Sequence, residues 1–140
     1  MARRRPPGDV GTDTETRVSA SGTGSSPIRV LHLRDSPWVD GPGRTILESG
    51  SHFDDKRVDY HVGVFVGTNA GAHPMIVAAK ERAISIHPVP DSGGFNRLIV
   101  DSIVELIDRF DIQVLHTSDL RSNIYGLLAR RRRPSVAIVC

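Results

Sequence analysis

The sequence predicts an α/β domain of three layers, in which a five-stranded parallel sheet of strand order 3-2-1-4-5 lies between two layers of helices. Apolar, β-rich segments alternate with helical patterns through residues 28–140, as in folds built from repeated strand–helix units. The second predicted strand, 58–67, has apolar residues at both odd and even positions. That pattern is typical of parallel strands that are covered on both faces.

The composition favours a single domain. The chain has 140 residues, of which 39% are hydrophobic, enough for one core of ordinary size. The net charge is only +2 and the arginines are bunched in Arg3–Arg5 and Arg130–Arg133, so the whole-chain charge does not identify a partner. One cysteine, Cys140, excludes an internal disulfide and a cysteine metal cluster.

No apolar run reaches the length of about 18 residues that a membrane-spanning helix needs. The residues that follow Arg3–Arg5 lack the apolar stretch of an export signal. Together with the single cysteine, these observations predict a cytoplasmic protein.

Residues 1–27 consist mainly of glycine, serine, threonine, proline and charged residues. Such a segment buries too little apolar surface to offset its ordering entropy, so we expect a disordered tail and a domain that begins at Ile28 and extends to residue 140. The cluster Arg3–Arg5 favours a solvated basic tail, with peripheral contact to acidic lipid left open and no nucleic-acid partner expected.

The first unit predicts a strand at 28–33, a loop from Arg34, and a helix that begins in Gly41-Pro42-Gly43 and ends near Gly50. Free backbone N–H groups and the helix dipole at such a start favour a phosphate or a nucleotide-linked ligand. Gly-Pro-Gly is also ordinary turn chemistry, so both interpretations stay open.

The middle of the chain predicts a loop at 68–73 and a helix at 75–82, which Pro74 opens. A short third strand follows at 83–87 and is closed by Pro88 and Pro90.

The clearest helix has apolar residues at helical spacing from Leu98 to Phe110, so this stripe is predicted to be core. A fourth strand at 112–116 and a capping signal at 117–119 lead into a last helix. Its inward side chains are predicted to be Leu120, Ile124, Leu127 and Leu128, and a fifth strand follows at 134–140.

The predicted strand order places a ligand crevice at the carboxyl ends of strands 1 and 4, where the connections diverge. The loops 34–43 and 116–119 therefore meet there. The candidate cleft residues are Asp35, Gly41, Gly43, Arg44, His116, Thr117 and Ser118.

Several familiar chemistries do not fit. The glycines follow the first strand too late for a nicotinamide-binding turn, and the second strand ends without an acidic residue. Asp35 has no carboxylate partner after strand 3, as a receiver domain would require. The histidines lack metal-ligand spacing and there is no Gly-Lys-Ser/Thr phosphate loop. We therefore assign no catalytic residue, no metal and no cofactor.

Three segments occur in an order and at a spacing that together resemble those of a known protein family. They are Ile28–Leu33 leading to Gly41-Pro42-Gly43-Arg44-Thr45, Asp111–His116 after a long amphipathic helix, and Ser122-x-x-Tyr125-Gly126-Leu127-Leu128-Ala129-Arg130 before Pro134–Val139. Over about residues 28–139 the chain resembles the amino-terminal domain of family 4 glycosyltransferases, which are retaining enzymes of the GT-B fold. The resemblance implies a Rossmann-like domain that binds a saccharide or lipid-linked acceptor, as in polysaccharide biosynthesis. It also implies that Gly41, Gly43 and Arg44 lie near the donor phosphates and that His116, Thr117 and Ser118 face the cleft.

The sequence departs from that family in two ways. The family usually has a histidine just after the fifth strand, where this sequence ends at Cys140, and we expect no second, donor-binding domain within these 140 residues. We therefore expect a truncated domain that is inactive alone, because positioning of both substrates is a major part of catalysis. A separately encoded donor-binding domain would complete the enzyme.

Two other functions remain open. The chain could be a non-catalytic binding or interaction module, with an unprotected end strand and an exposed cleft face. It could also be a flavodoxin-like domain that binds a phosphorylated small molecule.

Overall fold

The computed structural model describes residues 24–140. It confirms the predicted parallel sheet, with five strands in the order β3-β2-β1-β4-β5. The strands are β1 (Ile28–Arg34), β2 (Val58–Val66), β3 (Ser85–Pro90), β4 (Val114–Thr117) and β5 (Ala137–Val139). Most of the predicted tail, residues 1–23, lies outside the described residues, and residues 24–27 precede β1 without helix or strand.

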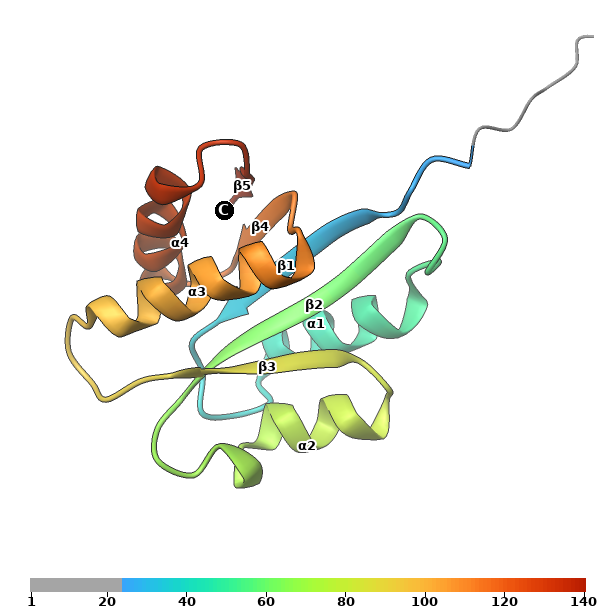
Figure 1. Cartoon of the computed structure of the whole chain (residues 1–140). Coiled ribbons are helices and arrows are strands. Elements are labelled where there is room, and N and C mark those ends of the chain that lie inside the picture. Colours follow the sequence, from blue (N-terminus) through green and yellow to red (C-terminus); the bar gives the residue numbers. More distant parts are fainter. Residues whose placement is uncertain (1–23) are drawn as a thin grey trace, which may run out of the picture.

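Helices cover both faces of the sheet, as Figure 1 shows. The helices α1 (Gly41–His52) and α2 (Pro74–Glu81) lie on one face, and α3 (Arg97–Phe110) and α4 (Leu120–Arg132) lie on the other. A short 3₁₀ turn, η1 (Ala70–Ala72), precedes α2. Within residues 24–140, no helix combines the length and apolar character needed to cross a bilayer.

The core has two parts, one on each face of the sheet. Under α3 and α4, Leu31, Leu33 and Leu115 are fully buried, and under α1 and α2, Val62 and Val64 are. Burial of each such side chain contributes about 1.5–3 kcal/mol. Side chains that alternate along the strands therefore provide apolar contacts to the helices on both faces of the sheet, as the apolar pattern of the second strand predicts.

The third strand is longer than predicted. It runs from Ser85 to Pro90 and includes both prolines, where the sequence predicts a strand at 83–87 closed by them. Because β3 lies at the edge of the sheet, a residue without an N–H donor is tolerated there. Ala83, with φ of 54°, belongs instead to the left-handed turn that precedes the strand.

The prediction that the apolar residues of the last helix face inward is wrong for three of the four. Leu128 is partly buried and packs against the core. Leu120, Ile124 and Leu127 are 77%, 44% and 47% exposed, and the buried residues of α4 are Ser122, Tyr125, Gly126 and Ala129. A Cβ at Gly126 would lie 2.8 Å from Cγ2 of Thr117. Small residues thus let α4 approach β4 closely, and the larger apolar residues occupy its outer side.

Candidate functional site

The loops after β1 and β4 meet at the carboxyl edge of the sheet. Leu33 of β1 pairs with Thr117 of β4, and just beyond them the backbone N–H of Asp35 donates to Oδ2 of Asp119 at 2.9 Å. Ser118 Oγ donates to the carbonyl of Leu33 at 3.5 Å. The two loops that the strand order places at the predicted crevice are therefore in contact.

Asp119 has two roles at this edge. Its Oδ1 accepts the backbone N–H of Ser122 at 2.8 Å, which caps α4 and satisfies one of the free donors of its first turn. Its Oδ2, besides accepting from Asp35, lies 3.6 Å from Nη1 of Arg34. One carboxylate thus holds the helix start and the loop after β1 together.

Arg34 is a buried arginine, only 7% exposed, at the end of β1. Its Nη2 donates to Oδ2 of Asp40 at 2.5 Å, and Oδ1 of Asp40 accepts the backbone N–H of Gly43 at 2.9 Å. The hydrogen bond from Gly43 and the charge of Arg34 hold the pKa of Asp40 below its usual value. Asp40 therefore places a carboxylate of the chain itself at the N-terminus of α1, where an anion is stabilised.

The predicted glycine loop forms the first turn of α1. Gly41 has open space around it, whereas a Cβ at Gly43 would lie 3.0 Å from both Asp40 Oδ1 and Met75 Sδ. Gly43 thus allows close packing of the loop against α2. Arg44 follows it, is exposed, and forms none of the ion pairs found in residues 24–140.

Arg121, in the first turn of α4, connects the loops after β1 and β3. Its guanidinium forms a bidentate pair with Asp91, with Nη2 2.8 Å from Oδ1, and Nη1 lies 3.4 Å from Oδ2 of Asp35. Its Nη2 also donates to the carbonyl of Gly94 at 3.0 Å. The hydrogen bond from Arg121 is the main cause of the lowered pKa of Asp91.

We refer to the six residues joined by these contacts as the edge cluster: Arg34, Asp35, Asp40, Asp91, Asp119 and Arg121. Its four carboxylates outnumber its two guanidiniums, so the cluster has net negative charge. The sequence identifies only Asp35 of the six. The sequence did contain a signal for three of the carboxylates. One or two residues after the ends of β1, β3 and β4 stand Asp35, Asp91 and Asp119.

Two predicted cleft residues lie apart from the edge cluster. Thr117 is 1% exposed beneath α4, and its Oγ1 donates to the carbonyl of Val139 at 3.3 Å. His116 stacks on His32 with ring centroids 3.9 Å apart. Nδ1 of His32 lies 2.8 Å from the hydroxyl of Tyr60. Burial, aided by the charges of His116 and Arg34, lowers the pKa of His32 to about 3.

A hollow of about 250 Å³ adjoins Asp91 at the same edge of the sheet. Its lining consists of apolar surface with a few polar groups, contributed by Val66, Gly67, Thr68, Pro90, Asp91, Ser92, Asn96 and Leu98. Nδ2 of Asn96 donates to Oγ of Ser92 at 2.7 Å. This combination suits a small hydroxylated ligand that packs one apolar face and uses its edges for hydrogen bonds. Residues 24–140 contain no group of three or more histidine, cysteine or acidic side chains that could hold a metal ion.

Two solved structures share this fold. HepE of Anabaena, in complex with UDP and glucose, is 15% identical, with a TM-score of 0.61 over 79% of this chain and 28% of its own. A glycosyltransferase from Rickettsia africae is 13% identical, with a TM-score of 0.62 over 81% of this chain and 29% of its own. The chain therefore spans less than a third of the length of either protein.

No protein-family profile matches the sequence, and no curated protein matches it. At these identities the likeness to the two structures establishes the α/β, Rossmann-like fold.

Proposed function

We propose that the chain is the acceptor-side domain of a glycosyltransferase of the GT-B type, and that a saccharide acceptor binds at the edge cluster and the adjoining hollow. The observation that supports this most is the cluster itself. Carboxylates and guanidiniums held by one another accept and donate hydrogen bonds in fixed directions, which matches the many hydroxyl groups of a sugar.

The charge of the edge cluster favours a neutral acceptor over a phosphate. Its carboxylates are in excess, so a phosphate is repelled there, and the N-terminus of α1 already holds the carboxylate of Asp40. We therefore assign the nucleotide-sugar donor to a separate domain. This domain alone transfers no sugar, because the second wall that would position the donor belongs to that other domain.

The remaining parts of the proposal rest on the sequence resemblance and the shared fold. They are membership of family 4, a saccharide or lipid-linked acceptor in polysaccharide biosynthesis, and a cytoplasmic location. Two structures with the same fold support this assignment: one is a glycosyltransferase from Rickettsia africae, and the other, HepE of Anabaena, was solved with UDP and glucose.

The proposal is tested by titrating the full chain with short glycans, UDP and inorganic phosphate, with backbone amide NMR shifts as the readout. We expect glycans to shift amides near Asp91, Ser92 and Asn96, and Asp91→Asn to weaken their binding roughly tenfold through loss of a charged acceptor. Asp108→Asn is the matched control, since Asp108 pairs with Arg133 on the exposed side of α3. A response to UDP or phosphate with none to glycans would favour the flavodoxin-like alternative.

A non-catalytic interaction module is the second candidate. One observation favours it: β5 lies at the edge of the sheet with no strand on its outer side, and Val139 is half exposed. Absence of any response to glycans, UDP and phosphate, together with a stable complex with another protein that Val139→Lys disrupts, would support this function.

A further inference from the structure

The outer side of α4 has an apolar stripe that nothing in residues 24–140 covers. Leu120, Ile124 and Leu127 follow one another at helical spacing and continue into Arg131. All four side chains are exposed, although apolar residues at this spacing usually mark a buried helix face. This exposure needs a functional explanation.

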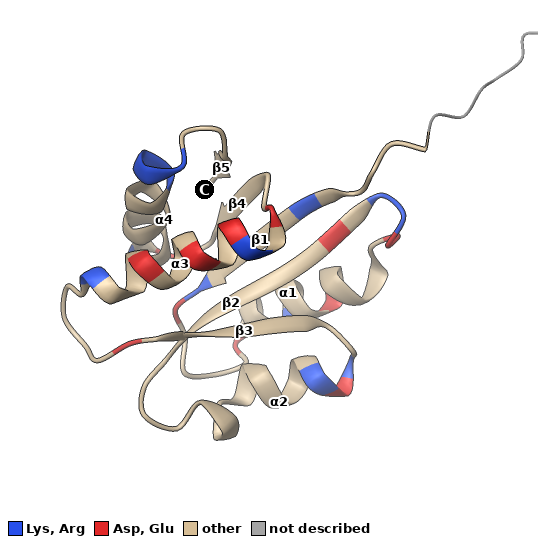
Figure 2. Ribbon diagram, in the orientation of Figure 1, with Lys and Arg blue, Asp and Glu red and all other residues tan. Residues whose placement is uncertain are grey.

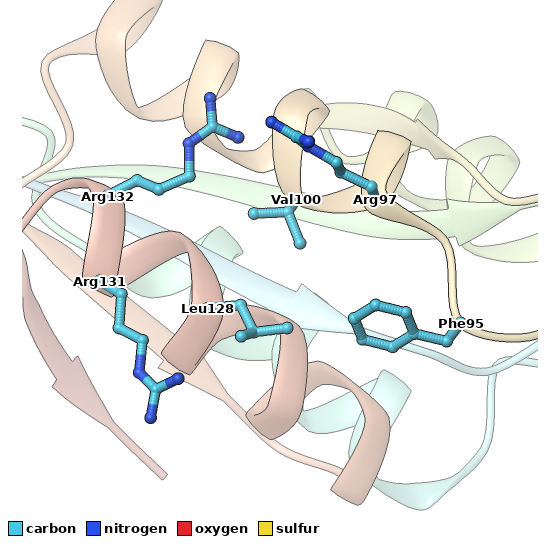
Figure 3. A pocket seen from close by; sticks show the side chains of 6 residues that line it. All are labelled: Phe95, Arg97, Val100, Leu128, Arg131 and Arg132. Carbon is cyan, nitrogen blue, oxygen red and sulfur yellow. The ribbon is translucent and has the colours of Figure 1, made fainter.

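A groove of about 390 Å³ lies beside this stripe, between α3 and α4. Figure 3 shows the side chains of Phe95, Val100 and Leu128 converging on it, with Arg97 and Arg132 at its rim. Phe95 is 76% exposed, and its ring stacks on Tyr125 with centroids 5.7 Å apart. The groove is therefore an apolar channel that opens to solvent beside arginines.

The charges around this surface are mainly positive. Arg97 and Arg131 form none of the ion pairs present in residues 24–140, whereas Arg132 pairs with Asp101. Figure 2 shows Lys and Arg gathered at the end of α4. Two free guanidiniums flanking apolar side chains attract groups with negative charge, and their aliphatic stems extend the apolar surface.

We propose that this α4 surface, formed by Phe95, Leu120, Ile124, Leu127, Arg97 and Arg131, binds the surface of a membrane that contains anionic lipids. The apolar side chains enter the boundary between headgroups and acyl chains. The guanidiniums pair with lipid phosphates, and the groove accepts part of an acyl chain. Phe95 and the exposed leucines of α4 lie between Arg97, at the start of α3, and Arg131, near the end of α4. The surface therefore combines apolar side chains with positive charge, which together attract a protein to an anionic membrane surface.

Other occupants fit less well. In a two-fold contact, a second copy would present the same surface, which contains Arg97 and Arg131 but no acidic residue, so neither guanidinium would gain an opposite charge. A folded protein partner would need fixed acidic groups opposite both Arg97 and Arg131. Mobile anionic headgroups meet this requirement without a matched shape.

Vesicle sedimentation of the full chain tests the proposal, with vesicles of phosphatidylcholine alone and of phosphatidylcholine with phosphatidylglycerol. We expect binding to the anionic vesicles that weakens with added salt. Arg97→Gln and Arg131→Gln should each reduce binding about fivefold, which corresponds to about 1 kcal/mol for one arginine at an anionic surface. Leu120→Gln and Leu127→Gln should reduce it roughly tenfold or more.

The control variant is Arg82→Gln, because Arg82 is exposed beyond the end of α2, on the opposite face of the sheet, and its side chain donates only to the carbonyl of Ala78. It should bind vesicles like the unchanged chain. Circular dichroism on heating should show that the glutamine variants of α4 keep their fold, since they replace exposed side chains.

Three results would overturn the proposal. The first is equal binding to both kinds of vesicle, or to neither. The second is vesicle binding that Leu120→Gln and Leu127→Gln leave unchanged, since it would then come from elsewhere in the chain, such as Arg3–Arg5. The third is a concentration-dependent dimer that those two variants abolish, which would identify the α4 surface as an interface between copies.

Discussion

Asp119 accepts the backbone N–H of Asp35, a residue 84 positions earlier in the chain, while its other oxygen caps α4. This pair of contacts joins the two halves of the sheet at the edge where the candidate site lies. The buried Arg34, 3.6 Å from the same carboxylate, adds an electrostatic contact. The local geometry of the site therefore depends on one side chain.

Replacement of Asp119 by alanine should destabilise the chain by about 1–3 kcal/mol, because it removes a helix cap and leaves the amide of Asp35 without its acceptor. Urea unfolding measures the change. Asp119→Asn retains an oxygen that can cap the helix, so it should lose less. Asp101→Ala, which removes an exposed ion pair, should cost well under 1 kcal/mol. Equal losses for Asp119→Ala and Asp101→Ala would contradict the joint role of Asp119.

Gly126→Ala should destabilise the chain by about 1–3 kcal/mol, although alanine is the better helix former. The added Cβ would lie 2.8 Å from Cγ2 of Thr117. Thr117→Ser removes that methyl group and keeps the hydroxyl, so the double variant should recover most of the loss made by Gly126→Ala. A double-mutant cycle from urea unfolding gives the coupling. Simple additivity of the two changes would show that the contact does not limit the approach of α4.

The stability of the fold should fall as the pH is lowered from about 6.5 towards 4. Burial lowers the pKa of His32 to about 3 and that of His87 to about 4, so the unfolded chain binds protons in this range before the folded chain does. The stabilisation is therefore complete above pH 6.5. It decreases by up to about 1.4 kcal/mol per pH unit for His32, and by less for the half-buried His87, because water screens its charge.

Unfolding free energies measured at several pH values give the slope of stability against pH. His32→Gln should make the loss of stability at low pH less steep. The lowered pKa values of Asp40 and Asp91 act below this window. If stability depends on pH in the same way in His32→Gln and in the unchanged chain, burial of His32 is not the cause of the pH dependence.

Removal of the Asp40 carboxylate should expose an anion site at the start of α1. Asp40→Gly leaves the N–H of Gly43 and the guanidinium of Arg34 without their acceptor, and glycine is itself an acceptable residue before a helix. Inorganic phosphate should therefore raise the midpoint of thermal unfolding of Asp40→Gly more than that of the unchanged chain, at equal ionic strength. Equal effects of phosphate on both proteins would show that Asp40 does not occupy an anion site.

The sheet could be predicted from the sequence because strand order follows from short, right-handed connections and from apolar residues on both strand faces. The edge cluster was mostly missed, since pairing between Arg34, Asp40 and Asp119 depends on side-chain directions across distant segments. The face of α4 was mispredicted for a different reason. Hydrophobic spacing favoured its leucines, but the contact between Gly126 and Thr117 determines which side can approach the sheet.

The two prolines of β3 have a consequence for association between chains. The N–H of Asp91 donates to the carbonyl of Val66 in β2, so the alternate positions, Pro88 and Pro90, point their nitrogen atoms away from β2 towards the open edge. Neither nitrogen carries a hydrogen. An incoming strand would find two donors missing in succession, so β3 resists the edge-to-edge pairing through which exposed sheets aggregate.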